Sequence, residues 1–203
     1  VVMCRCVLET DPDLCKELIA VVDGKLGQDP DANVECVRVE LRRLIKEHRV
    51  NAGPLTDLED LRLTLAELAI DADYVLDLHC DWEAAIHLYT SDSSWPDAAD
   101  LSAQIGAEAC LIAEESGANP FDEAFSRPWV ELRRVYGDKF PIPMATLSTT
   151  IELRGEQDVM ITLPVRMQRT CLHSCNVVAL SQVIPAPCPR QNARPHRLQV
   201  LIA

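Results

Sequence analysis

Residues 69–81, Ala69-Ile-Asp-Ala-Asp-Tyr-Val-Leu-Asp-Leu-His-Cys-Asp81, decide the fold, because the hydrophobic pattern changes there from a helical to a strand period. Before this stretch, apolar residues recur every three or four positions, as on one face of a helix. Tyr74-Val-Leu-Asp-Leu-His79 is instead a short apolar run, which predicts a buried strand that ends in polar residues. The stretch therefore predicts that the first strand of a β-sheet follows a group of helices in the sequence.

Three helices are predicted before this strand. Asp11-Pro-Asp13 has a proline and two acids where a helix begins, and a second helix is expected from about residue 31, with apolar positions from Val34 to Ile45. Thr56-Asp-Leu-Glu59 has the spacing of a capping box. The leucines behind it predict a helix whose buried face contains Leu58, Leu61, Leu65 and Leu68.

Strands and helices alternate after residue 81. Strands are predicted at 85–90, 109–113 and 145–153, and helices at 97–106 and in the second half of 121–136, beginning near Pro128. This alternation is typical of the α/β class, so we expect a mixed β-sheet flanked by helices.

The acidic residues are unevenly distributed. All 32 Asp and Glu residues lie in 1–159, whereas 160–203 contain five arginines, five prolines and no acid. Two interpretations compete: a basic, proline-rich arm that binds an acidic partner, or a stretch that is not evolved sequence, as after a slipped reading frame. We favour the second. We therefore assign 1–159 to one partial domain and treat 160–203 as an aberrant or disordered tail outside the fold.

Composition argues against several classes of protein. The net charge of −13 disfavours non-specific binding to nucleic acid or to an anionic membrane, and no run of about 18 apolar residues predicts a membrane span. No signal peptide is recognisable, so we interpret the nine cysteines as reduced thiols of a cytoplasmic protein. The cluster Cys171-Leu-His-Ser-Cys175 has no second ligand pair at zinc-finger spacing, and we interpret it as a chance occurrence.

Two strand ends carry residues with catalytic chemistry. His79 lies where an apolar strand stops, and Asp77 is placed to orient its ring; the alternative is a structural histidine. Glu152 lies within an apolar strand, where an ionised carboxylate is costly unless it is used or paired; the alternative is a structural pair with Arg154. His87 follows His79 by eight residues and has either a supporting role at the site or a structural one.

These residues belong to an ordered series of segments that resembles the succinylglutamate desuccinylase/aspartoacylase family. The series consists of 69–81, His87-Leu-Tyr-Thr90, 115–129 and Thr150-Ile-Glu-Leu-Arg-Gly-Glu156, and the resemblance covers roughly residues 11–159. It implies an incomplete zinc carboxypeptidase-like fold. It also implies that His79 is a zinc ligand, that Glu152 is the general base or acid, and that Arg127 or Arg154 binds a substrate carboxylate.

The implied activity is metal-assisted hydrolysis of an amide (or ester) bond in a small acylated amino acid, in which zinc lowers the pKa of its water toward about 7. Family members take two further zinc ligands from an early His-x-x-Glu. None of the five histidines here is followed by Glu at that spacing. We therefore interpret the chain as an N-terminally truncated member whose single zinc ion lacks two of its usual ligands. The alternative is a non-catalytic remnant or interaction module without metal.

Overall fold

The computed structural model describes residues 13–70, 72–81, 85–114, 120–154, 180–184 and 196–202. The helices are α1 (Asp13–Val22), α2 (Pro30–Asn51), α3 (Asp57–Ala69), α4 (Trp95–Ile105) and α5 (Phe121–Tyr136), with a 3-10 turn at Asp92–Ser94. The strands are β1 (Tyr74–Asp81), β2 (His87–Thr90), β3 (Ala109–Ile112), β4 (Leu147–Arg154), β5 (Leu180–Ile184) and β6 (His196–Ile202).

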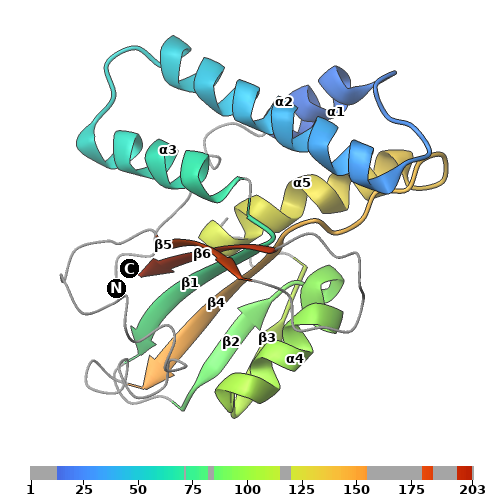
Figure 1. Ribbon diagram of the computed structural model, residues 1–203. Coiled ribbons are helices and arrows are strands. Elements are labelled where there is room, and N and C mark those ends of the chain that lie inside the picture. Colours follow the sequence, from blue (N-terminus) through green and yellow to red (C-terminus); the bar gives the residue numbers. More distant parts are fainter. Residues whose placement is uncertain are drawn as a thin grey trace.

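The six strands form one mixed sheet in the order β3-β2-β4-β1-β6-β5. β1 is parallel to β4 and to β6, while β2 is antiparallel to β4. Helices α1, α2, α3 and α5 cover one face of the sheet and α4 covers the other, which gives three layers (Figure 1). The expected α/β class, with a mixed sheet flanked by helices, is confirmed.

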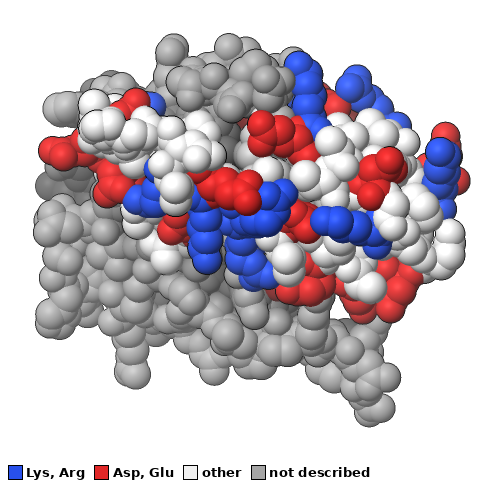
Figure 2. Space-filling model, turned by 90° about the horizontal axis from the view of Figure 1, so that it is seen from above, with Lys and Arg blue, Asp and Glu red and all other residues white. Residues whose placement is uncertain are grey.

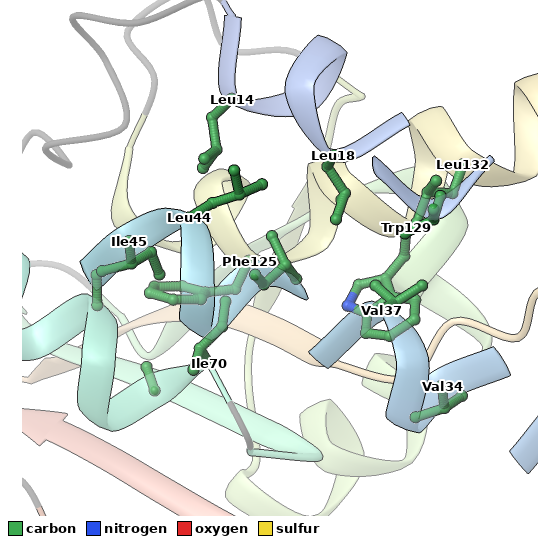
Figure 3. Close-up of a cluster of buried hydrophobic side chains, with 14 of the residues drawn as sticks. Leu14, Leu18, Val34, Val37, Leu44, Ile45, Ile70, Phe125, Trp129 and Leu132 are labelled. Atoms are coloured by element: carbon green, nitrogen blue, oxygen red, sulfur yellow. The ribbon is translucent and has the colours of Figure 1, made fainter. Parts of the chain in front are cut away.

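The larger core lies between the sheet and the four-helix layer. Figure 3 shows side chains from α1, α2 and α5 gathered there, with Phe125 and Trp129 among the largest. Both aromatic side chains are almost fully buried. A smaller core on the other side of the sheet contains the buried residues Leu76, Leu78, Leu88, Ile151 and Leu153 and packs against Leu101 and Ile105 of α4.

Helix α5 begins earlier than the sequence pattern predicted. It starts at Phe121, so Pro128 lies inside the helix rather than at its start. A proline inside a helix removes one backbone hydrogen bond. Here that loss is offset by the burial of Phe125 and Trp129, one on each side of the proline.

Of the four leucines expected on the buried face of α3, only Leu65 is buried. Leu63, Leu65 and Ala66 are buried, whereas Leu58, Leu61 and Leu68 are 40–47% exposed. The leucines of α3 occupy more than one face, so spacing alone did not decide which of them meets α2.

Two strands lie in residues 160–203, the segment that was expected to be a tail outside the fold. β5 and β6 both lie within 160–203, and β6 pairs in parallel with β1. Neither strand was predicted, because 160–203 had been placed outside the fold. The division into 1–159 and 160–203 stays a prediction.

The exposed face of α2 carries charges of both signs. Arg42 contacts Glu35, Arg43 contacts Glu40 and Glu47, and Arg49 contacts Asp60 and Glu67 of α3. Figure 2 looks onto the helical layer and shows basic (blue) and acidic (red) side chains intermingled on this face. In the described part of the chain, no helix is both long and apolar enough to cross a membrane.

The predicted capping box at the start of α3 is confirmed. The Thr56 hydroxyl accepts from the Glu59 amide at 3.3 Å, and the Glu59 carboxylate accepts from the Thr56 amide at 2.7 Å. We expect Thr56→Ala to lower the free energy of unfolding by about 1 kcal/mol, because an amide of the first turn loses its partner. Urea unfolding measures this loss. Thr56→Ser keeps the hydroxyl, so an equal loss in that variant would show that the cap is not responsible.

Candidate active site

The sheet register brings His79, Glu152 and His87 into one row. His79 of β1 pairs with Glu152 of β4, and Glu152 pairs in turn with His87 of β2. Residues that are opposite one another on neighbouring strands point to the same face of a sheet. Glu152, which is far from His79 and His87 along the chain, therefore lies between them in a row across three adjacent strands.

The alternation of side chains along β1 shows which face of the sheet carries this row of residues. Leu76 and Leu78 pack into the smaller core against α4, while Val75 belongs to the larger core on the helical side. Asp77 and His79 share the parity of Val75, so they point toward the layer that contains α5. The apolar residues thus hold the strand in place and direct its polar residues to the other face.

The imidazole of His79 lies between two carboxylates. Its Nε2 is 3.0 Å from Oδ2 of Asp77, and its Nδ1 is 3.5 Å from Oε1 of Glu152. Nε2 is buried, and the Asp77 oxygen lies off the direction of a well-formed hydrogen bond, so this contact is chiefly electrostatic. The side chains of His79 and Glu152 are 15% and 16% exposed. Both therefore remain open to solvent on one side.

The carboxylates favour the protonated form of His79. The close contact with Asp77 raises the pKa of His79; burial opposes this, and the negative charges of Asp77, Glu152 and Asp122 add to it. The site therefore concentrates negative charge around one imidazole.

Asp122 is the site residue that sequence reasoning missed. It lies in the first turn of α5, is 5% exposed, and its Oδ1 has no hydrogen-bond partner among the described residues. Burial raises the pKa of Asp122 to about 7, and the charges of Glu123 and Asp77 contribute. The sequence pattern placed the start of this helix near Pro128, so it did not mark Asp122 as an acid of the first turn.

His87 is held by its own loop. Its Nδ1 is 2.8 Å from the carbonyl oxygen of Ala85, so Nδ1 carries the proton and donates it. The ring also packs edge-on against Tyr89, with 5.4 Å between the ring centroids. The register places His87 beside Glu152, and its supporting role at the site stays a prediction.

The two candidate arginines lie in different places. Arg127 is exposed on α5, and its charge partly opposes the burial that raises the pKa of the Cys15 thiol on α1. Five residues along a helix change the direction of a side chain by about 140°, so Arg127 and Asp122 point to different sides of α5. Arg154 is the last residue of β4, in register with Asp81. Either role in substrate binding stays a prediction.

The donor set of the described residues does not fit zinc by itself. Zinc sites in proteins use three or four protein ligands. Among the described residues, no group of three His, Cys, Asp or Glu side chains is arranged to hold a metal ion. The Cys171–Cys175 cluster lies outside the described residues.

The fold is shared with part of two known hydrolase-family structures. One, from Shewanella amazonensis SB2B, is described as a succinylglutamate desuccinylase/aspartoacylase family protein; it superimposes with a TM-score of 0.56 at 24% identity over 70% of this chain. The other, from Shewanella frigidimarina NCIMB 400, carries a succinylglutamate desuccinylase/aspartoacylase description; it superimposes with a TM-score of 0.56 at 20% identity over 71% of this chain. The expected resemblance to this family is confirmed at the level of the fold.

The chain spans 37% and 38% of the lengths of these two structures. No protein-family model and no curated protein matches it. The activity of the whole relatives is therefore a proposal for this chain.

Proposed function

We propose that the chain carries the His79–Glu152 part of the active site of a hydrolase of the succinylglutamate desuccinylase/aspartoacylase type. The proposed reaction is cleavage of an amide (or ester) bond in a small acylated amino acid. The single observation that carries the proposal is the pairing of His79 with Glu152 across β1 and β4, with 3.5 Å between His79 Nδ1 and Glu152 Oε1.

The proposed roles follow from the surroundings of each side chain. Glu152 is partly exposed, so its carboxylate can take a proton from a water molecule that attacks the substrate carbonyl. Asp77 holds the His79 ring from the buried side. Of the two candidate arginines we propose Arg154 for binding a substrate carboxylate, because it follows Glu152 by two residues on β4 and a guanidinium matches a carboxylate in shape and charge.

Zinc enters this proposal only through the family. His79 is the ligand that this chain would contribute, and the remaining ligands are not among the described residues. Because the described residues do not fit the ion by themselves, the roles proposed for Asp77, Glu152 and Arg154 are those of the side chains alone.

Hydrolysis of acylated amino acids tests the proposal. We expect the purified chain, supplied with zinc, to release the free amino acid from N-succinylglutamate or N-acetylaspartate only slowly, because His79 alone cannot hold zinc tightly. His79→Ala or Glu152→Gln should reduce this low rate further, by about 10²-fold or more. His48→Gln on α2 replaces a histidine outside the site and should leave the rate unchanged. Full activity of His79→Ala in the presence of zinc would contradict the assignment.

A second function has one observation in its favour. Both ring nitrogens of His79 already face carboxylates, as in a structural ion-pair network, and this arrangement suits a non-catalytic remnant or interaction module. Metal analysis of the purified chain separates the two proposals. One zinc ion per chain, lost in His79→Ala, would count against the second function.

A further inference from the structure

Two large apolar side chains lie exposed on the sheet, Tyr89 of β2 and Leu111 of β3. The two residues pair across these strands and are 40% and 44% exposed. Their neighbours along the strands, Leu88 and Cys110, lie in the smaller core, which packs against α4. Because side chains alternate along a strand, Tyr89 and Leu111 point to the other face of the sheet, away from α4.

This other face also carries the candidate active site. Tyr89 lies two residues beyond His87 on β2 and pairs with Thr150, which lies two residues before Glu152 on β4. Residues two apart on a strand share a face, so Tyr89 and Leu111 adjoin the row that contains Glu152. Diagonal neighbours such as Glu152 and Tyr89 are about 7–8 Å apart, a distance that a short acyl group can span.

The helical layer does not close over this part of the face. In the described part of the chain, the main contacts of α5 with the sheet are to β4 and β1, and the main helix contact of β2 is with α4 on the opposite side. The exposed fractions of Tyr89 and Leu111 agree with this arrangement. The two side chains therefore form an apolar surface that is open to solvent beside the catalytic carboxylate.

Tyr89 is held in a defined position. Its ring packs edge-on against His87, and its backbone oxygen accepts a hydrogen bond from the hydroxyl of Thr149 at 2.6 Å. Leu88, the preceding residue, is fully buried and anchors β2 from the other face. A surface that is already ordered binds a ligand with a smaller loss of conformational entropy.

The order of residues along β4 indicates which part of a substrate meets this surface. Arg154, which we propose for the substrate carboxylate, follows Glu152 by two residues, whereas Thr150, the partner of Tyr89, precedes it by two. A substrate with its carboxylate at Arg154 and its carbonyl carbon at Glu152 therefore extends its acyl group toward Tyr89 and Leu111.

We propose that Tyr89 and Leu111 form a subsite for an apolar acyl group, so that the preferred substrates are amino acids acylated with an apolar group larger than acetyl, such as benzoyl. The proposal rests on the proposed function, which leaves the acyl group open. Affinity comes from the removal of apolar surface from water. In this role Tyr89 and Leu111 determine specificity and contact no reacting atom.

Equilibrium binding of two probes to the full 203-residue chain tests the subsite. N-benzoylglycine and N-acetylglycine share the carboxylate and the amide and differ in the apolar acyl group, and ligand-observed NMR titration gives the Kd of each. We expect the wild type to bind N-benzoylglycine about tenfold more tightly. Tyr89→Ala and Leu111→Ala should remove most of this preference, whereas Tyr89→Phe keeps the ring and should retain it.

Ile112→Ala is the matched control. Ile112 follows Leu111 on β3, is 42% exposed and points to the other face, so its replacement should leave the preference unchanged. Equal affinities of the wild type for the two probes, no measurable binding of N-benzoylglycine, or equal losses in Leu111→Ala and Ile112→Ala would overturn the proposal. Circular dichroism shows which variants fold, and either Tyr89→Ala or Leu111→Ala suffices if the other does not.

Sedimentation of the same variants detects a different occupant of this face. A wild-type dimer that Tyr89→Ala dissociates would overturn the proposal, because the face would then be an interface between two copies of the chain. The binding measurements require neither zinc nor turnover. A chain that keeps the benzoyl preference without hydrolysis would therefore contradict the proposed reaction alone, and hydrolysis without that preference would contradict the subsite alone.

Discussion

Trp129→Ala should lower the free energy of unfolding by about 3–5 kcal/mol, the range for removing a fully buried aromatic side chain. Trp129 is 1% exposed and is the largest fully buried side chain of the described residues. It fills the space between α5 and the other helices of the layer (Figure 3). Alanine would leave a cavity that the surrounding leucines and valines cannot close without moving the helices.

Urea unfolding followed by circular dichroism measures this loss, since the substitution removes a fluorophore. Val135→Ala on the same helix is the matched control, because Val135 is 45% exposed and its replacement should change stability by less than about 0.5 kcal/mol. Similar losses for the two variants would show that α5 is not anchored through Trp129.

Asp122→Asn should make the chain more stable than the wild type at neutral and alkaline pH. The pKa of Asp122 is about 7 in the folded chain and near 3.8 when the group is solvated. The folded state thus binds a proton more tightly than the unfolded state. The wild-type chain loses stability as the pH rises from about 4 through 7, whereas asparagine has no proton to lose. The free energy of unfolding of Asp122→Asn, relative to that of the wild type, should therefore increase by up to about 4 kcal/mol over this pH range.

Urea unfolding of both chains between pH 4 and pH 8 checks this prediction. Glu131→Gln removes one acid from a surface pair with Arg134 on the same helix and should show no such gap. A gap between Asp122→Asn and the wild type that stays constant with pH would mean that Asp122 is not the group that titrates.

Local sequence patterns predicted most elements correctly for physical reasons that act over a few residues. The Thr56–Glu59 spacing produces the capping box because two side chains and two amides satisfy one another within a single turn. The run from Tyr74 to His79 became β1 because apolar residues at consecutive positions suit a strand covered on both faces. His79 and Glu152 stood out because ionisable groups in such strands are costly.

The errors came from contacts that span the chain. The burial of Phe125 and Trp129 extends α5 through Pro128. Which leucines of α3 are buried depends on how that helix lies against its neighbours. β6 pairs with β1 and β5, although it lies in the stretch 160–203 that the sequence pattern had placed outside the fold.

The sequence alone determined the α/β class, the main helices and strands, and His79 and Glu152 as candidates, because periodicity and capping are set by neighbours along the chain. Only the tertiary structure decided that the two side chains lie side by side and that His87 joins their row. The reason is that strand register and helix packing minimise the free energy of the whole core. A short stretch of sequence cannot specify that minimum.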